Sequence, residues 1–437
     1  MIPICISCSV DTDTLLLLEG DPDLELTQQI EGLYGSLSAL RLPPSDAYSE
    51  IPADPGNPIT REKVALGQLL FHETALGTAP VSPEGYQTYS CASCHHAAAQ
   101  FQSGMLQGIG EGGSGFGHQG EARGISENYT PEMLDVQPIR SPTVLNTAYQ
   151  EVMLWNGQFG ALGINAGTEV QWTEGTPKEK NTLGFSGVET QAIAGLGVHR
   201  LHLDSQWLQE YPQYQALFDQ AFPDIPEAER YTDLNAGLAI AAFERTVLSN
   251  QAPFQQWLRG DSDAMGEVQK QGALLFFGKA RCYECHNGPG LNGMGFHALG
   301  MDDFQPGLVF GEVDEATRKG RGGFTGNPED DYAFKIPTLY NLKGLSFLGH
   351  GGSFSSVESV IRYKNEAIPQ NPGVPESQLS GAFVPLALSE VEILQLTAFV
   401  EEALYDPSMQ RYVPTSLPSG QCFPVADPAA RTDLGCD

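Results

Sequence analysis

Residues 91–95 read Cys-Ala-Ser-Cys-His, and residues 282–286 read Cys-Tyr-Glu-Cys-His. Both stretches match C-x-x-C-H, the attachment motif of a c-type haem. In this motif the two thiols add to the vinyl groups of the porphyrin, and the histidine coordinates the iron. A redox-active cysteine pair or half of a zinc site would explain a single C-x-x-C. Two copies that both carry the histidine favour haem, so the chain is predicted to bind two covalently attached haem c groups.

The motif also assigns individual residues to the two haems. Those predicted to hold the porphyrins or to ligate the irons are Cys91, Cys94, His95, Cys282, Cys285 and His286. His95 and His286 are the expected iron ligands. We therefore expect the rest of the chain to position and tune two irons.

Three further landmarks recur in the same order around the two motifs. The matching pairs are Gly67–Phe71 with Gly272–Phe276, Ser141–Asn146 with Ile336–Asn341, and Phe185–Thr190 with Phe354–Ser359. An ordered series of similar segments indicates an internal repeat. With 49 glycines and 30 prolines, the connections between helices should be long loops. The predicted fold is mainly α, with two homologous cytochrome-c-like haem domains and long loops.

The repeat predicts how the chain is divided. We expect an N-terminal extension over residues 1–60, an N-terminal haem domain over 61–254, a C-terminal haem domain over 255–415 and a tail over 416–437. Function should lie where the repeats differ. Trp155 and His350 occupy equivalent positions, at the same distance after Pro142 and Pro337.

The composition excludes one class of partner. The 437 residues carry a net charge of −31, so no basic stripe is available to neutralise phosphates and nucleic acid is not expected. The acidic surface could be an ordinary solvated surface, an adaptation to high salt, or a surface that attracts a basic electron-donor protein. No apolar run is long enough to span a membrane.

The remaining cysteines bear on the compartment. Cys422 and Cys436 flank a short tail and are predicted to form a disulfide, which fits an exported, oxidising compartment such as the periplasm. Cys5 and Cys8 lie in a stretch that resembles the end of a bacterial lipoprotein signal, in which Cys8 would carry the lipid. A local disulfide between Cys5 and Cys8 is the alternative.

Together with Leu154–Gly157, Glu189–Ala192 and Gly349–Gly352, these motifs resemble the bacterial di-haem cytochrome c peroxidase family, which includes the di-haem maturase of methylamine dehydrogenase. The resemblance runs from about residue 61 to residue 412. It implies that the N-terminal haem reacts with hydrogen peroxide and that the C-terminal haem receives electrons from a small donor protein, a cytochrome c or a cupredoxin. Trp155 matches the tryptophan that lies between the two haems in the family.

The resemblance also implies a group for proton transfer at the peroxide site. Gln191 matches the distal glutamine of the family, but Leu201 stands where the family has its acid–base glutamate. His199 and His202 flank Leu201, and an imidazole can do the same work at neutral pH. We expect His199 or His202 to transfer the proton and Arg200 to polarise peroxide or anchor a haem propionate. These histidines could instead be surface residues or lie at the haem edge.

Further iron ligands follow from the same resemblance. His118 corresponds to a loop histidine that ligates the N-terminal haem in the resting state, although a plain loop histidine is the alternative. On the helix after Gly349–Gly352, where the family has Met or Tyr, Tyr363 is the predicted ligand of the C-terminal haem, with Lys364 beside it. The alternative is that Tyr363 faces the core. Residues held in reserve as ligands are Met294, Met301 and His297. Calcium is doubtful, because Arg140 replaces the asparagine of the family's calcium site.

Three functions are therefore weighed. The leading one is a peroxidase that reduces hydrogen peroxide to water with electrons from a donor protein. The second is an enzyme that uses peroxide to oxidise side chains of a partner protein. The third is a two-haem electron carrier, which the distal candidates Gln191 and His199 or His202 argue against. Familial peroxidases often dimerise, so a homodimer is a further expectation.

Overall fold

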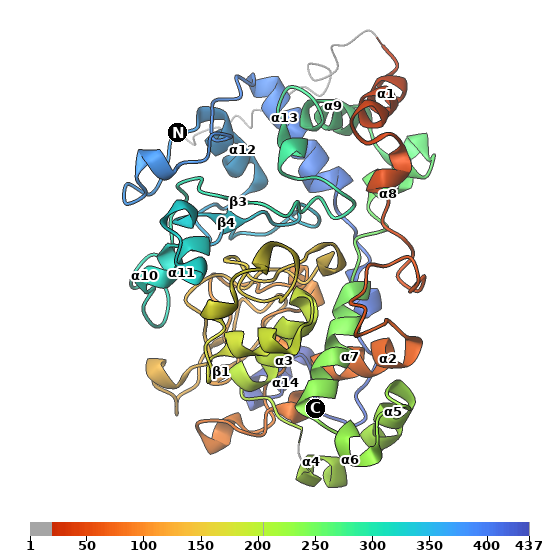
Figure 1. Cartoon of the computed structure of the whole chain (residues 1–437), viewed down its shortest axis with the longest axis vertical. Helices are drawn as coiled ribbons and strands as arrows, with labels where there is room; N and C mark the ends of the chain where they lie inside the picture. Colours follow the sequence, from red (N-terminus) through yellow and green to blue (C-terminus); the bar gives the residue numbers. More distant parts are fainter. Residues whose placement is uncertain (1–19, 204, 437) are drawn as a thin grey trace, which may run out of the picture.

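A computed structural model describes residues 20–203 and 205–436, so Cys5 and Cys8 lie outside the described residues. Helices dominate and the strands are short, which confirms the predicted fold class (Figure 1). The helices are α1 Pro22–Tyr34, α2 Arg61–His72, α3 Gly187–Val198, α4 Ser205–Glu210, α5 Gln213–Ala221, α6 Glu227–Arg230, α7 Asp233–Thr246, α8 Pro253–Leu258, α9 Glu267–Phe276, α10 Glu315–Arg318, α11 Arg321–Thr325, α12 Val357–Glu366, α13 Glu390–Ala398 and α14 Pro428–Leu434. The antiparallel strand pairs are β1 Gly113–Ser114 with β2 Gly124–Ile125, and β3 Phe296–His297 with β4 Phe334–Lys335.

The first lobe, in the lower half of Figure 1, is built around α2, α3 and α7. The Thr60 hydroxyl caps α2 by accepting from the Lys63 N–H, and apolar residues at helical spacing, such as Leu66 and Leu70, are buried. Gly67 lies where α2 crosses α7: a Cβ atom there would be 1.9 Å from the Ala239 carbonyl oxygen. Only glycine permits this approach, which fixes the crossing of the two helices.

The second lobe repeats this crossing with α9 and α13. Gly272, the counterpart of Gly67, lies where a Cβ atom would be 2.0 Å from the Gln395 carbonyl oxygen. Phe276 is fully buried between these helices, and Phe399 packs on it with ring centroids 5.3 Å apart. The sequence repeat is therefore a repeat of structure, with one close helix pair beside each C-x-x-C-H motif.

The terminal segments cross to the opposite lobes. The extension that contains α1 packs on the second lobe, where Asp23 accepts from the Trp257 indole at 2.6 Å and pairs with Lys270 at 2.7 Å. At the other end of the chain, Met409 and Tyr412 belong to the core of the first lobe. The predicted domain boundaries stay a prediction, but each hydrophobic core draws on residues from beyond the boundary of its lobe.

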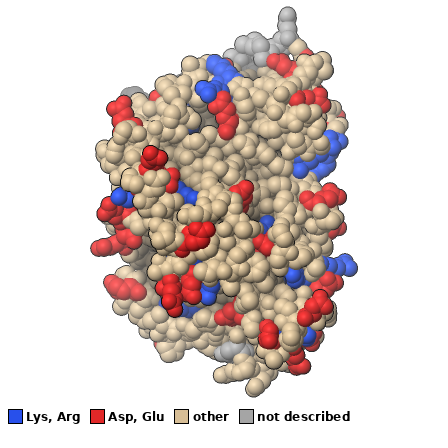
Figure 2. Space-filling model, in the orientation of Figure 1, with Lys and Arg blue, Asp and Glu red and all other residues tan. Residues whose placement is uncertain are grey.

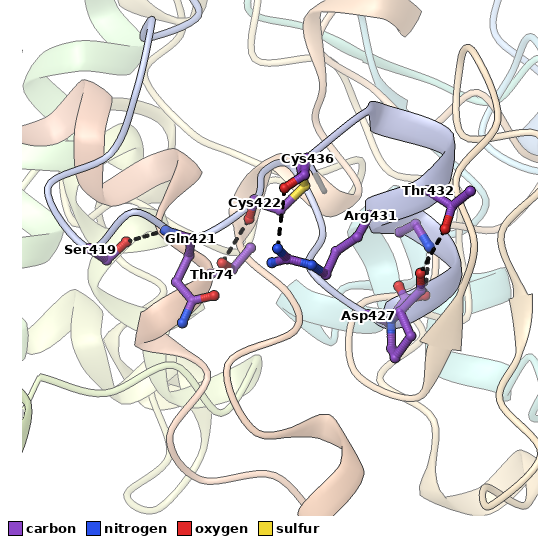
Figure 3. Close-up of a disulfide and its surroundings, with 10 residues drawn as sticks. Thr74, Ser419, Gln421, Cys422, Asp427, Arg431, Thr432 and Cys436 are labelled. Atoms are coloured by element: carbon purple, nitrogen blue, oxygen red, sulfur yellow. Dashed lines mark hydrogen bonds between the residues drawn. A yellow bond between two sulfur atoms is a disulfide. The ribbon is translucent and has the colours of Figure 1, made fainter.

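The C-terminal tail packs against the first lobe (Figure 3). The predicted disulfide between Cys422 and Cys436 is confirmed. The Cys422 carbonyl accepts from the Thr74 hydroxyl at 2.9 Å, which fixes this end of the tail beside α2. Asp427, at the start of α14, forms a buried ion pair with Arg123 at 3.0 Å. The tail therefore covers the loops next to the first haem motif.

The surface carries charges of both signs. On the face in Figure 2, acidic side chains are scattered with basic ones between them, and the acidic excess comes from 54 Asp and Glu against 23 Lys and Arg in the whole chain. Among residues 20–203 and 205–436, no helix has the length and apolar character needed to cross a membrane.

Candidate functional site

The second C-x-x-C-H motif opens into a cavity of about 300 Å³. Cys282, Cys285 and His286 all line it. The Nδ1 atom of His286 lies 3.1 Å from the Pro337 carbonyl oxygen and 3.2 Å from that of Leu291. With Nδ1 bonded to carbonyl groups, Nε2 is the nitrogen left to bind a metal. Burial lowers the pKa of His286 to about 4, which keeps the imidazole neutral as ligation requires.

The first motif is built in the same way. The Nδ1 atom of His95 lies 3.4 Å from the Phe101 carbonyl oxygen, and burial lowers the pKa of His95 to about 4. The hydroxyl of Ser93, inside the motif, donates to the Pro424 carbonyl at 3.0 Å, so the tail helps to hold the motif in place. Burial raises the pKa of both Cys91 and Cys94, and these thiols are free.

The residues present therefore fit two haem groups. Each motif offers a pair of free thiols and a neutral imidazole whose Nδ1 is already bonded to a carbonyl. The second motif also faces a cavity lined largely by apolar side chains, which suits a porphyrin. The proximal roles of His95 and His286 remain predictions.

Trp155 and His350, predicted to be equivalent in the repeat, contact each other across the two lobes. Their ring centroids are 6.3 Å apart in an edge-on arrangement, and both residues line the cavity of the second motif. His350 stacks on Phe334 with a centroid separation of 3.7 Å, and its Nε2 lies 3.2 Å from Asp303 Oδ1. The Trp155 indole donates to the Arg140 carbonyl at 2.8 Å. Trp155 of the first lobe thus contacts His350 of the second, and a role of this contact in electron transfer stays a prediction.

Arg140 is buried beside this group. Its guanidinium donates to the carbonyl oxygens of Met105 at 2.6 Å and Ser103 at 2.8 Å, and to the Gln102 side chain at 3.0 Å. Its backbone N–H donates to the His350 carbonyl at 3.0 Å, which ties the lobes together. The cationic guanidinium already donates to these uncharged oxygens, so the residues around Arg140 do not fit a calcium ion.

Gln191 on α3 and His199, the residue that caps the C-terminal end of α3, lie on the same side. A Cβ atom on Gly195, between them in the sequence, would lie 3.6 Å from Gln191 Nε2 and 3.9 Å from His199 Cδ2. His199 Nδ1 lies 2.9 Å from Oδ2 of Asp135, a carboxylate that is almost fully buried. Burial lowers the pKa of His199, but the charge and hydrogen bond of Asp135 outweigh burial, and the net pKa is raised.

The His199–Asp135 pair lies beside the first haem motif. The charge of Asp135 contributes to the raised pKa of Cys94, and the charge of His199 contributes to the lowered pKa of His95, each second to burial. Asp135 was missed in the sequence because nothing in its loop marks it. It lies 64 residues before His199, and only the fold brings the two together.

The residues that follow His199 point in different directions. Leu201, at the family's glutamate position, is buried in the first core. Arg200 pairs with the buried Glu111 at 2.6 Å. His202 pairs with Asp233 at 2.9 Å, and the two side chains are 39% and 38% exposed. The two histidines are similarly exposed, at 32% and 39%, but the partner of His199 is 6% exposed and that of His202 is 38% exposed, so the His199 pair is the more buried of the two.

The other predicted ligands are placed as follows. His118 is exposed, and its backbone N–H donates to the Glu121 carboxylate at 3.0 Å. The Tyr363 hydroxyl donates to the Leu299 carbonyl at 2.5 Å, whereas the neighbouring Lys364 lines the cavity of the second motif, as do His297 and Met301. Ligation by His118 or Tyr363 stays a prediction.

Comparisons with known proteins agree with this construction. Residues 61–263 match the family model described as di-haem cytochrome c peroxidase. The chain is 30% identical over 383 residues to cytochrome-c peroxidase IdrP1 of Denitromonas iodatirespirans, covering 83% of this chain and 86% of the relative. It is 28% identical over 361 residues to methylamine utilization protein MauG of Methylorubrum extorquens, covering 82% of each.

A solved structure shares the fold. It is the crystal structure of a MauG-like protein associated with microbial copper homeostasis, which aligns with a TM-score of 0.55 at 22% identity and covers 84% of this chain and 94% of its own. The two motifs, the repeated lobes and the sequence relatives lead to one assignment: the chain belongs to the di-haem cytochrome c peroxidase family.

Proposed function

We propose that this protein is a peroxidase that reduces hydrogen peroxide to water at its first haem site, with electrons that a small donor protein delivers to the second. The His199–Asp135 pair carries the proposal, because a two-haem electron carrier has no use for a proton-transfer group beside one motif. Each turnover takes one peroxide, two protons and two electrons, and forms two waters. When bound, the haems supply the redox chemistry that breaks the oxygen–oxygen bond.

In this proposal the proton chemistry is supplied by Asp135, by His199 at the end of α3 and by Gln191 on α3. Asp135 accepts a hydrogen bond from Nδ1–H of His199 and so leaves Nε2 free to take a proton from peroxide. The same nitrogen can return that proton to the leaving oxygen. Gln191, on the same side of α3, would orient the bound peroxide through its amide. Arg200 would act through Glu111 at the edge of the site rather than on peroxide itself.

Trp155 and the donor complete the proposed path. The contact between Trp155 and His350 supports electron transfer from the second haem site to the first. The acidic surface supports a donor with a basic docking face, such as a small cytochrome c or a cupredoxin. The Cys422–Cys436 disulfide supports an exported, oxidising compartment. Lipid attachment at Cys8 stays a prediction outside the described residues.

A second candidate function is peroxide-dependent oxidation of side chains on a partner protein. The relationship to MauG and the oxidisable Trp155 ring between the two sites support it. The two functions differ in their products. A peroxidase oxidises its donor stoichiometrically with peroxide, whereas the alternative leaves a covalently modified partner that mass spectrometry would detect.

The experiment is stopped-flow oxidation of a reduced donor cytochrome by peroxide, with holo-protein of measured haem content. His199→Ala should lower kcat/KM for peroxide by about 10²–10⁴-fold, the usual contribution of a positioned acid–base group. The matched control is His202→Ala, which loses a similar pair at the surface and should stay near wild type. Equal activity of His199→Ala and wild type would overturn the proposed role.

A further inference from the structure

Helix α12 presents one face to the cavity of the second haem motif. Four of its residues line that cavity, at spacings of three and four positions: Val357, Val360, Ile361 and Lys364. This is the spacing of a single helix face. Lys364 ends that face, and Cys282, Cys285 and His286 line the same cavity.

Tyr363 lies on a different face of α12. Its hydroxyl donates to the Leu299 carbonyl at 2.5 Å, and its ring packs on Phe354 and Phe383 with centroids 5.0 and 5.1 Å away. Tyr363 is buried and does not line the cavity. Of these two neighbours on α12, Lys364 therefore lines the cavity of the second motif, whereas Tyr363 packs in the core.

Lys364 also differs from the other basic residues around the cavity. Arg140 donates to carbonyl oxygens, Lys335 donates to Gln150, and Arg318 pairs with Asp303 at 3.5 Å. In the described part of the chain, by contrast, the Lys364 amine has no hydrogen bond and no ion pair. Its Nζ atom makes a cation–π contact with the Phe383 ring, 5.1 Å from the ring centroid. A half-buried ammonium without a hydrogen-bond acceptor is costly, so this site favours the neutral amine, whose lone pair is then available to a metal.

We propose that Nζ of Lys364 is the second axial ligand of the iron held by Cys282, Cys285 and His286, an assignment that rests on the proposed binding of haem at this motif. The amine binds through its lone pair, and the ammonium proton leaves to solvent. Two nitrogen ligands close this iron to peroxide, which suits a haem that only passes electrons. An amine is a harder donor than the thioether of methionine, so the reduction potential is lower than with a His–Met pair.

The test is the electron paramagnetic resonance (EPR) and near-infrared magnetic circular dichroism (MCD) of ferric holo-protein, with two haems per chain verified first. Wild type should show a low-spin second haem with two nitrogen ligands. Lys364→Ala should turn that haem high-spin, and Lys364→Met should restore a low-spin haem with a sulfur–iron charge-transfer band and a higher potential. Lys343→Ala, which removes a surface lysine that pairs with Glu402, is the matched control and should leave the spectra unchanged.

Two further variants separate the rival ligands. Tyr363→Phe and Met301→Leu should both keep the wild-type spectra. The proposal is overturned if Lys364→Ala keeps the low-spin signal, or if Tyr363→Phe or Met301→Leu loses it. Lys364→Met keeps a side chain of similar length, so it reports on ligation even if the alanine variant folds poorly. The spectra are recorded without peroxide. They can therefore contradict the assignment of Lys364 while the proposed peroxidase activity holds, or support it while the activity is absent.

Discussion

His199 and Asp135 face each other at 2.9 Å beside the first haem motif, with Nδ1 of the imidazole directed at the carboxylate. This contact fixes the tautomer of the histidine and leaves Nε2 as the nitrogen available to react in the proposed function. An imidazole held in this way can replace the glutamate that the family has at the position of Leu201. The replacement has consequences for the pH dependence of turnover.

Replacing Asp135 with Asn should shift the pH profile. In wild type the carboxylate raises the pKa of His199, although burial alone would lower it. His199 must be neutral to accept the proton of peroxide, so kcat/KM should rise as the pH increases through this raised pKa. In Asp135→Asn the effects of burial and of the Arg200 charge remain, both of which lower the pKa of His199, so the rise of kcat/KM should move to lower pH.

The control for this shift is Asp233→Asn, which removes the corresponding partner of His202 at the surface. Its profile should coincide with wild type. A profile of Asp135→Asn that is unshifted, or shifted to higher pH, would contradict the role of the pair.

Replacing Trp155 with Phe should slow electron transfer between the haems. The variant loses the oxidisable indole and its hydrogen bond to the Arg140 carbonyl. We expect the rate of donor oxidation to fall by about tenfold or more, equivalent to about 1.4 kcal/mol of barrier. The step is measured by reducing the second haem with a light flash and following the absorbance change of the first haem. Trp172→Phe, in the loop before α3, removes a tryptophan whose indole donates to the Thr168 hydroxyl, and it should transfer electrons at the wild-type rate. An equal loss in both variants would count against a specific path.

The buried pair of Glu189 and Arg245 should be important for stability. The guanidinium donates to the carboxylate through Nε at 2.7 Å and Nη2 at 2.6 Å, and both side chains are almost fully buried. Glu189→Ala leaves an unpaired buried charge and should lower the free energy of unfolding by about 3–5 kcal/mol. The double variant Glu189→Leu with Arg245→Met removes both charges. Its free energy of unfolding should therefore fall much less than that of Glu189→Ala. Urea unfolding of the holo-protein gives the two values, and a double variant as unstable as the single one would refute this explanation.

The disulfide of the tail should stabilise the folded chain. Closing a loop of roughly 15 residues is worth about 3 kcal/mol through the entropy of the unfolded state. The double variant Cys422→Ser with Cys436→Ser should therefore have a lower Tm than wild type, in a thermal scan followed by circular dichroism. Reductant should lower the Tm of wild type to the same value and leave the double variant unchanged. A shift of the double variant by reductant would point to other reducible bonds.

Part of this architecture was predictable from local patterns, and part depended on distant contacts. The haem motifs, the repeat and the Cys422–Cys436 pair are signalled by residues close in sequence. The repeat matches Gly67 with Gly272, but the close helix crossings at these glycines became visible only in the fold. The exchange of terminal segments between lobes could not be foreseen, since the contact of Asp23 with Trp257 joins residues far apart in the chain.

For the candidate sites, too, the sequence suggested residues but did not reveal their contacts. The sequence offered His199 and His202 equally, and their partners Asp135 and Asp233 became visible only in the fold. Tyr363 and Lys364 are neighbours, so a rotation of α12 by one residue decides which of them faces the cavity. That rotation is set by core packing around Phe354 and Phe383, which no local pattern encodes.

The difference between the two irons is measured most directly by EPR of the ferric holo-protein during titration with hydrogen peroxide. We expect two haems per chain, with a low-spin signal from the second site. The first site should give a high-spin signal, because His118, the resting ligand that the family resemblance implies, is exposed here. Peroxide should remove the high-spin signal rapidly in wild type and slowly in His199→Ala. Two low-spin haems that do not respond to peroxide, or a single haem per chain, would contradict an open peroxide site joined to a closed electron-transfer site.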